Sequence, residues 1–338
     1  MKKIFIRSPY FIQVNEANQL GSKVELYLYN KGESVPILPT YILSKKAATT
    51  TQLENTYNIA NYAKEFIKPI APVSVSVPTE ENVNCWAYCI VKRYTELTLG
   101  VYSLLSTETF VCLNGYTDYT GGYNNYNDEE VLPLVNTNIT YYKSIANNYI
   151  NVFFDENLTG VLWTDDITEF DFNITDFSLY KLPIINNNNW TLYYSPYEFI
   201  FNVEGLCEVK YTPITCTFIN RFGGWQYLTF FKANLQSIET TNKDFNLLPS
   251  SVNYNVLQGQ KRTFNQQGKQ KIKCNTGWVD ENYFDLIQDL LMSEVVLLDN
   301  KPVIVKSTSS DYKTHLKDKN INYEIEFEFN YGLINDVI

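Results

Sequence analysis

The chain has 338 residues, of which 45% are hydrophobic and 19% are charged, and this balance excludes a wholly disordered protein. Its formal net charge of −10 disfavours general binding to nucleic acid phosphates, and the sequence lacks a run of about 18 apolar residues. We therefore expect that the protein does not insert into a membrane and that it is synthesised in the cytoplasm. The aromatic share of 15% favours β-sheets, and the length predicts two or three domains, of which we expect three.

The first domain is expected over residues 1–125, as a β-sandwich with one short helix. Alternating apolar side chains predict strands, which we expect at 4–6, 11–14, 24–29, 40–43, 85–91 and 109–113. Helical spacing of apolar residues predicts the helix at 59–67. We expect Asn58 to cap its start and Pro69 to prevent its continuation.

A second unit is expected over residues 126–200, as a small β domain or an insertion. Gly, Asn, Tyr and Asp dominate residues 114–130, which is the composition of a loop and of a domain boundary. Short apolar runs then alternate with polar clusters such as the four asparagines at 186–189. This alternation predicts short strands separated by loops.

The third domain is expected over residues 201–338, as a set of β-strands with one α-helix at 280–292. Apolar residues recur at helical spacing in that segment, and its first turn is acidic, which complements the helix dipole. Two strands are predicted around the glycine-containing turn at 221–225. The polar stretch that follows, up to Gly268, is interpreted as a loop or a long hairpin.

Side chains suited to catalysis or metal binding are scarce. His315 is the only histidine, which excludes a multi-histidine metal site, and we assign it no role. Cys85 and Cys89 would lie about 13 Å apart on a strand, and the six cysteines are interpreted as free thiols. The acidic residues at 165–171 are interpreted as a solvated loop. We therefore predict no catalytic residue, no cofactor and no metal, and expect that the protein is not an enzyme.

A basic segment in the C-terminal part is the first candidate for a binding surface. It holds five cations with no acidic residue between them, namely Lys261, Arg262, Lys269, Lys271 and Lys273. On an acidic protein such a segment is either an assembly arm that meets an acidic neighbour or an exposed hairpin.

The last predicted strand supplies the second candidate surface. Between residues 321 and 329, apolar side chains alternate with Glu324, Glu326 and Glu328, which places three carboxylates on one exposed face. This acidic face is either simply solvated or directed at the lumen of a channel.

Short motifs near both ends of the chain permit a comparison with a known family. They are FINRFGGW at 218–225, CNTGWV at 274–279, LLMSE at 290–294, PVIV at 302–305, YEIEFEF at 323–329, and, nearer the N-terminus, RSPY at 7–10, VELYLY at 24–29 and LNGY at 113–116. In these motifs the chain resembles virion proteins of phages of Bacteroidetes, including crAss-like phages. The resemblance leaves roughly residues 130–200 uncovered. It implies a C-terminal tail-tube-like β-sandwich plus one α-helix, and no catalytic residues.

The resemblance implies a structural protein of the virion tail. We expect a tail hub or portal-tail ring subunit that forms a homo-oligomeric ring with copies of itself. Other phage tail or portal-proximal proteins are its expected partners, and DNA is expected to pass its channel without specific binding. The alternative is a baseplate module whose Tyr-, Asn- and Gly-rich loops bind a host-surface glycan or receptor.

Overall fold

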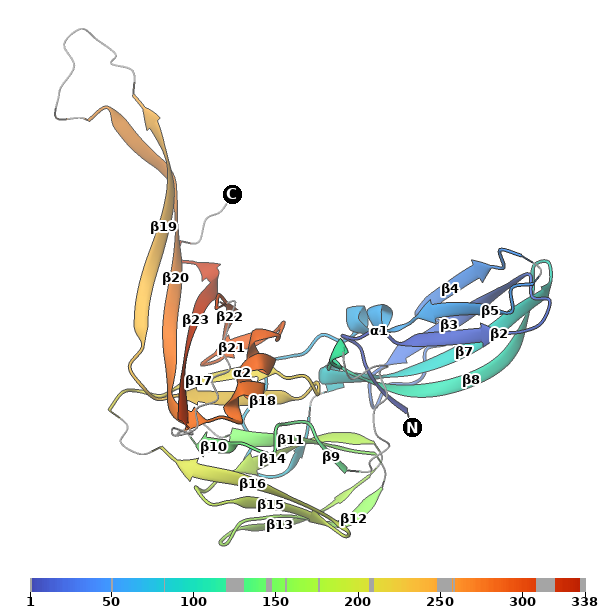
Figure 1. Cartoon of the computed structure of the whole chain (residues 1–338), viewed down its shortest axis with the longest axis horizontal. Helices are drawn as coiled ribbons and strands as arrows, with labels where there is room; N and C mark the ends of the chain where they lie inside the picture. Colours follow the sequence, from blue (N-terminus) through green and yellow to red (C-terminus); the bar gives the residue numbers. More distant parts are fainter. Residues whose placement is uncertain are drawn as a thin grey trace.

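The computed structural model describes residues 2–49, 51–81, 83–119, 131–143, 148–155, 157–175, 177–206, 210–247, 257, 259–307 and 320–334. The described chain is mainly β and contains several sheets, a 3-10 turn at Val83–Cys85 and two short α-helices, which confirms the predicted fold class. Figure 1 shows three groups of strands: the N-terminal group in blue and cyan, the middle group mainly in green to yellow-green, and the C-terminal group in yellow to red.

The N-terminal group is a β-sandwich with a short helix. The strands of its larger sheet are, in order, β1 (Lys2–Phe5), β8 (Val101–Leu113), β7 (Trp86–Thr98), β3 (Gly21–Tyr29) and β4 (Tyr41–Lys46). The second layer consists of β2 (Phe11–Asn15), β5 (Glu54–Asn58) and α1 (Ala60–Phe66). Ile12 and Val14 of β2 pack with Leu26 of β3 in one core, because alternate side chains of each strand face the opposite layer.

Helix α1 begins one residue later than predicted. Its N-cap is Ile59, and the Oδ1 atom of Asn58 accepts a hydrogen bond from the backbone N–H of Ala60 at 3.2 Å from one position further out. The helix ends at Phe66, and the next residue adopts an extended backbone. That stop precedes Pro69 by three residues, in agreement with the restriction that proline places on the preceding chain.

Strands β7 and β8 extend well beyond the predicted segments 85–91 and 109–113. They form a hairpin of two 13-residue strands, and Gly100 in the connecting turn has a φ of 79°. The outer halves of both strands carry charged and polar side chains among exposed apolar ones, and they lack the apolar run that marks the inner halves. For this reason the sequence pattern revealed only the buried half of the hairpin.

Two sheets make up the middle group. The strands of the first sheet are, in order, β10 (Thr140–Lys143), β16 (Tyr197–Gly205), β15 (Trp190–Tyr194), β12 (Leu158–Thr164) and β13 (Glu169–Ile174). The strands of the second sheet are, in order, β6 (Thr79–Glu80), β14 (Ser178–Ile184), β11 (Asn148–Phe154) and β9 (Val131–Pro133). The middle group thus draws on chain beyond both expected limits, since β6 lies before residue 126 and β16 crosses residue 200.

The C-terminal group is a seven-stranded sheet with one helix. From one edge to the other, the strands of the sheet are β18 (Trp225–Phe230), β17 (Ile214–Ile219), β21 (Val296–Leu298), β22 (Lys301–Val305), β23 (Asn320–Gly332), β20 (Lys261–Asp280) and β19 (Leu235–Asn246). Helix α2 (Tyr283–Leu291) lies inside the predicted segment 280–292, and this confirms the predicted helix. Its buried side includes Leu286, Ile287 and Leu290, as the helical spacing requires.

Buried contacts connect the three groups. Trp163 of the middle group and Phe327 of the C-terminal sheet belong to one hydrophobic cluster, and the Gln226 amide donates to the hydroxyl of Tyr141 at 3.2 Å. A second cluster joins the N-terminal sheet to both other groups, with Trp86 packed edge-on against Phe153 at 5.7 Å. The expected units are therefore joined through shared cores.

The polar stretch that precedes Gly268 is a long hairpin. Strand β19 pairs with β20 along its length, whereas β23 pairs with β20 only from Lys269 onward. Residues 241–246 and 261–267 therefore form a ribbon of two strands, which we call the distal arm. The distal arm extends from the C-terminal sheet away from the rest of the molecule (Figure 1).

Candidate functional site

The two candidate surfaces predicted from the sequence lie on adjacent strands and contact each other. Three lysines of β20 face three glutamates of the neighbouring strand β23. Ion pairs join the two rows, with nitrogen–oxygen distances of 3.0 Å for Lys269–Glu328, 3.8 Å for Lys271–Glu326 and 2.5 Å for Lys273–Glu324. We call these six residues the charge ladder.

Within the charge ladder, ion-pair partners shift each other's pKa. A hydrogen bond to Glu324 raises the pKa of Lys273, and the same bond lowers the pKa of Glu324. The pKa of Lys271 is raised first of all by Glu239 of β19, whose carboxylate lies 2.6 Å from its Nζ atom. These shifts favour the charged form of each group, so cations and carboxylates coexist and largely offset each other at neutral pH.

Glu328 does not lie on an open surface, and the prediction that the whole glutamate row is exposed is wrong at this position. The residue is 5% exposed, because the Lys269 and Lys306 side chains reach its carboxylate from two sides, at 3.0 and 3.3 Å. Glu324 and Glu326 keep side-chain exposures of 54% and 41%. An unpaired acidic wall is therefore absent from this face, whereas the direction in which it faces in an assembly stays a prediction.

The other two cations of the predicted arm, Lys261 and Arg262, lie in the distal arm. In the described part of the chain neither of them forms an ion pair with a carboxylate. Beside them, Phe245 and Phe264 pack edge-on at 5.6 Å and remain 44% and 47% exposed. The predicted arm thus has a proximal part whose charges are paired within the chain and a distal part that combines free cations with exposed aromatic rings.

The acidic segment at 165–171 includes a carboxylate with a structural role. Asp165 accepts hydrogen bonds from the backbone N–H groups of Ile167 at 3.0 Å and Thr168 at 2.5 Å, and from the Asn186 amide at 3.0 Å. Burial raises the pKa of Asp165, but these hydrogen bonds outweigh it and lower the pKa below its ordinary value. Asp165 therefore stabilises the turn between β12 and β13.

The cysteines that the structure describes behave as core residues. Cys85, Cys89, Cys112, Cys216 and Cys274 are buried and free, which confirms the free-thiol prediction for these five. Burial raises the pKa of Cys85 to about 12, so its thiol stays protonated and unreactive at neutral pH. Cys207 and His315 lie outside the described residues. Among the described residues, no group of three or more His, Cys, Asp or Glu side chains is arranged to hold a metal ion.

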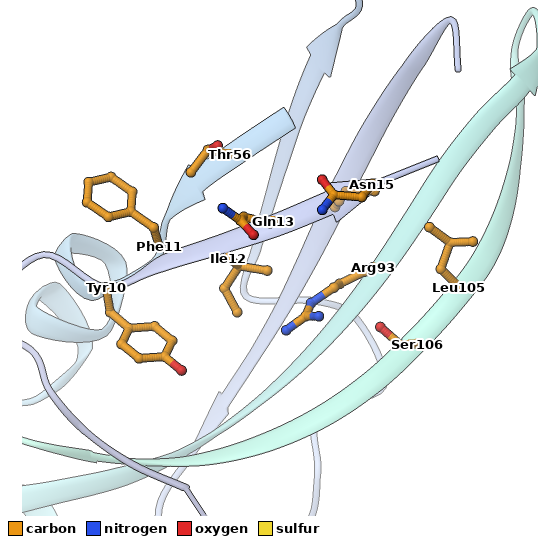
Figure 2. A pocket seen from close by; sticks show the side chains of 10 residues that line it. Tyr10, Phe11, Ile12, Gln13, Asn15, Thr56, Arg93, Leu105 and Ser106 are labelled. Carbon is orange, nitrogen blue, oxygen red and sulfur yellow. The ribbon is translucent and has the colours of Figure 1, made fainter. Parts of the chain in front are cut away.

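A groove of about 710 Å³ lies in the N-terminal sandwich, between β2 and the β7–β8 hairpin (Figure 2). Six consecutive residues at 10–15 line it on one side, and Leu105 and Ser106 of β8 line it on the other. Among the described strands, β2 pairs with β5 alone, so its second edge is open to the groove. Arg93 lies between the two sides and forms an ion pair with Glu108. Aromatic, amide and hydroxyl side chains therefore surround one open space.

A buried carboxylate that the sequence did not reveal lies where the three groups meet. Asp289 of α2 is 1% exposed and accepts hydrogen bonds from the hydroxyl of Tyr116 at 3.3 Å and the amide of Asn136 at 3.4 Å. Burial raises its pKa to about 6, although Arg221 acts in the opposite direction. Nothing in the helical pattern distinguishes this aspartate from its exposed neighbour Asp285, since its partners come from distant segments.

No family model matches the chain, and no curated protein is found to match it. None of the helices in the described residues has the length and apolar character needed to cross a membrane.

Proposed function

We propose that this protein is a structural subunit of a bacteriophage virion, in the tail or in the connector next to the portal. It assembles into a ring with copies of itself and contacts other tail or portal-proximal proteins. The ring surrounds a channel through which DNA passes without specific binding. The proposal includes no catalytic activity.

The observation that carries this proposal is the β19–β20 hairpin. All twelve residues of β19 are exposed, and no third strand pairs with the distal arm within the described residues. A two-stranded ribbon in water is only marginally stable, whereas packing against another surface stabilises it. Its exposed aromatic rings and free cations are suited to that packing. A subunit that assembles with neighbours accounts for an arm of this kind.

The first test is the oligomeric state, measured by size-exclusion chromatography with light scattering over a range of concentrations. We expect a closed oligomer of defined mass for the wild-type chain. Replacing Phe245 and Phe264 by Ser should shift the equilibrium towards the monomer, because the arm loses its apolar contacts. Ile37→Ser is the matched control, since Ile37 is 97% exposed in the N-terminal group. A monomeric wild-type chain at all concentrations would contradict the proposal.

The groove in the N-terminal sandwich favours a second candidate function, the binding of a host-surface glycan. Tyr10 and Phe11 offer rings for a sugar face, and Gln13, Asn15 and Thr56 offer hydrogen-bonding groups (Figure 2). Isothermal titration with polysaccharide from the host surface tests this candidate. Binding by a monomeric chain that is lost in Gln13→Ala and retained in a surface variant such as Glu198→Gln would favour it over the assembly subunit.

A further inference from the structure

The distal arm has two faces of different character. Register pairs Phe245 with Arg262 and Lys243 with Phe264, and directly opposite residues of an antiparallel pair project to the same side. One face therefore carries two aromatic rings and two cations. Asp244, the only acid of the distal arm, pairs with Thr263 and projects to the other side. We call Lys243, Phe245, Arg262 and Phe264 the arm face.

A complementary surface exists on the outer side of the first middle sheet. Register places Glu198, Tyr193, Leu162 and Asp171 in one row across β16, β15, β12 and β13. The next row is Ile200, Thr191, Thr164 and Glu169. We call these eight residues the acceptor face. Tyr193 and Ile200 are 45% and 53% exposed on the neighbouring strands β15 and β16, and the carboxylates Glu198, Asp171 and Glu169 stand at the ends of the two rows.

The charges of the two faces are opposite and unpaired within the chain. Strands β12, β13, β15 and β16 contain no Lys or Arg, and their carboxylates Glu169, Asp171 and Glu198 form no ion pair within the described residues. The cations of the arm face, Lys243 and Arg262, likewise form none there. Opposite potentials steer association and fix the orientation of two partners.

The distal arm is also long enough to cross the acceptor face. Six residues of an antiparallel strand extend about 20 Å, and four paired strands span about 14 Å between the outer two. The acceptor face lies on the side of the middle group away from the C-terminal sheet, whereas the distal arm extends in another direction (Figure 1). The arm of one chain therefore does not reach its own acceptor face, so these two complementary faces can meet only between two copies of the chain.

We infer that the arm face of one copy docks on the acceptor face of the next, with Phe245 and Phe264 against Tyr193 and Ile200. This inference rests on the proposed assembly function and names the surface that receives the arm. The contact joins two different surfaces of the same chain, so it is heterologous, and successive contacts generate a ring when the rotation closes. The cations of the arm face then lie opposite the carboxylates at the edges of the acceptor face.

A charge swap tests this docking. The arm variant carries Lys243→Glu and Arg262→Glu, the acceptor variant carries Asp171→Lys and Glu198→Lys, and a third chain carries all four changes. We expect each two-site variant to weaken association at least about tenfold, and the four-site variant to recover most of it, because opposite charges face each other again. Light scattering measures the oligomer, and circular dichroism with urea unfolding verifies that each variant is folded.

Matched controls isolate the two faces. Lys261→Glu changes a cation on the opposite side of the arm, and Glu16→Lys changes an acid in the N-terminal group, so both should assemble as the wild type does. A second measurement uses Phe264→Cys in one chain and Tyr193→Cys in another, mixed and treated with a bis-maleimide. Crosslinking between the two chains is expected, since the described native cysteines are buried.

The outcomes separate this inference from the proposed function. If the arm variant weakens assembly but the acceptor variant assembles normally and no crosslink forms, the acceptor face is wrong and the assembly function survives. Unchanged assembly of both variants overturns the docking altogether. A wild-type chain that stays monomeric overturns both the docking and the assembly function.

Discussion

Lys269 and Glu328 form an ion pair at 3.0 Å in which the lysine is mostly exposed and the glutamate is buried. The carboxylate therefore depends on Lys269 and Lys306 to replace the water that it has lost. Glu328→Gln should lower the free energy of unfolding by about 1 to 2 kcal/mol, since a neutral amide leaves this arrangement poorly satisfied. Glu324→Gln, on an exposed carboxylate whose ion pair with Lys273 is screened by water, should shift the urea midpoint much less. Equal midpoints for both variants would contradict this assignment.

The sign of the pH dependence follows from the same pair. Lys269 lowers the pKa of Glu328 below its ordinary value of 4.5. The folded state then binds the proton less readily than the unfolded chain, so the stabilisation is present above the ordinary pKa and is lost as the pH falls through the folded-state pKa. Unfolding curves should therefore show the difference between wild type and Glu328→Gln at neutral pH, and a smaller difference below pH 4.5.

Local patterns in the sequence predicted the elements whose two faces differ. The alternation in β23 and the helical stripe of α2 come from neighbouring residues, and both elements are found where predicted. Strand β19 has no apolar alternation and is exposed throughout, so its pairing with β20, and not its own sequence, makes it a strand. The sequence also identified the basic and the acidic segment by their composition. It did not predict that their charges pair with each other, because this pairing depends on the adjacency of β20 and β23.

The shared core between the middle and C-terminal groups predicts that the two unfold together. Tyr141 and Tyr227 pack at 5.5 Å, and the hydroxyl of Tyr283 donates to the carbonyl of Thr140 across the same boundary. A fragment of residues 206–338 lacks Tyr141 and Thr140, so it would expose Tyr227 and Tyr283 to water. We expect that fragment to be unfolded or aggregated when expressed alone. A soluble fragment with a cooperative unfolding transition of its own would show that the C-terminal sheet folds independently.

Asp289 predicts a pH dependence of opposite sign to that of Glu328. Its folded-state pKa of about 6 lies above the ordinary value of 3.8, so the folded chain prefers the protonated form. The stability associated with Asp289 is then fully present below pH 3.8 and is lost as the pH rises through 6. Replacing Asp289 by Asn removes the titration, so the variant should gain about 2 to 3 kcal/mol relative to wild type between pH 4 and pH 7.

Urea unfolding at the two pH values measures this gain, and it cancels any effect of the substitution that does not depend on pH. Asp166→Asn serves as the control, because Asp166 is exposed in the turn that Asp165 stabilises. The difference from wild type that this variant shows at each pH is the baseline against which the Asp289→Asn difference is read. A pH-independent difference for Asp289→Asn would show that this carboxylate titrates normally.

The last prediction concerns the face of β23 in an assembled particle. If the charge ladder faces the channel, its lysines and glutamates give passing DNA a nearly neutral wall. Glu324→Lys and Glu326→Lys together would make that wall strongly cationic, and each phosphate that it neutralises releases counterions and adds favourable binding free energy. Both side chains are substantially exposed, so the variant should fold and assemble, and Glu328 must stay unchanged because it is buried.

We expect slower DNA ejection from particles that carry this lysine variant, whereas particles that carry Glu324→Gln with Glu326→Gln should eject DNA normally. Normal ejection from well-formed lysine-variant particles, or an electron-microscopy map that places β23 on the outer surface of the ring, would show that this face does not line the channel.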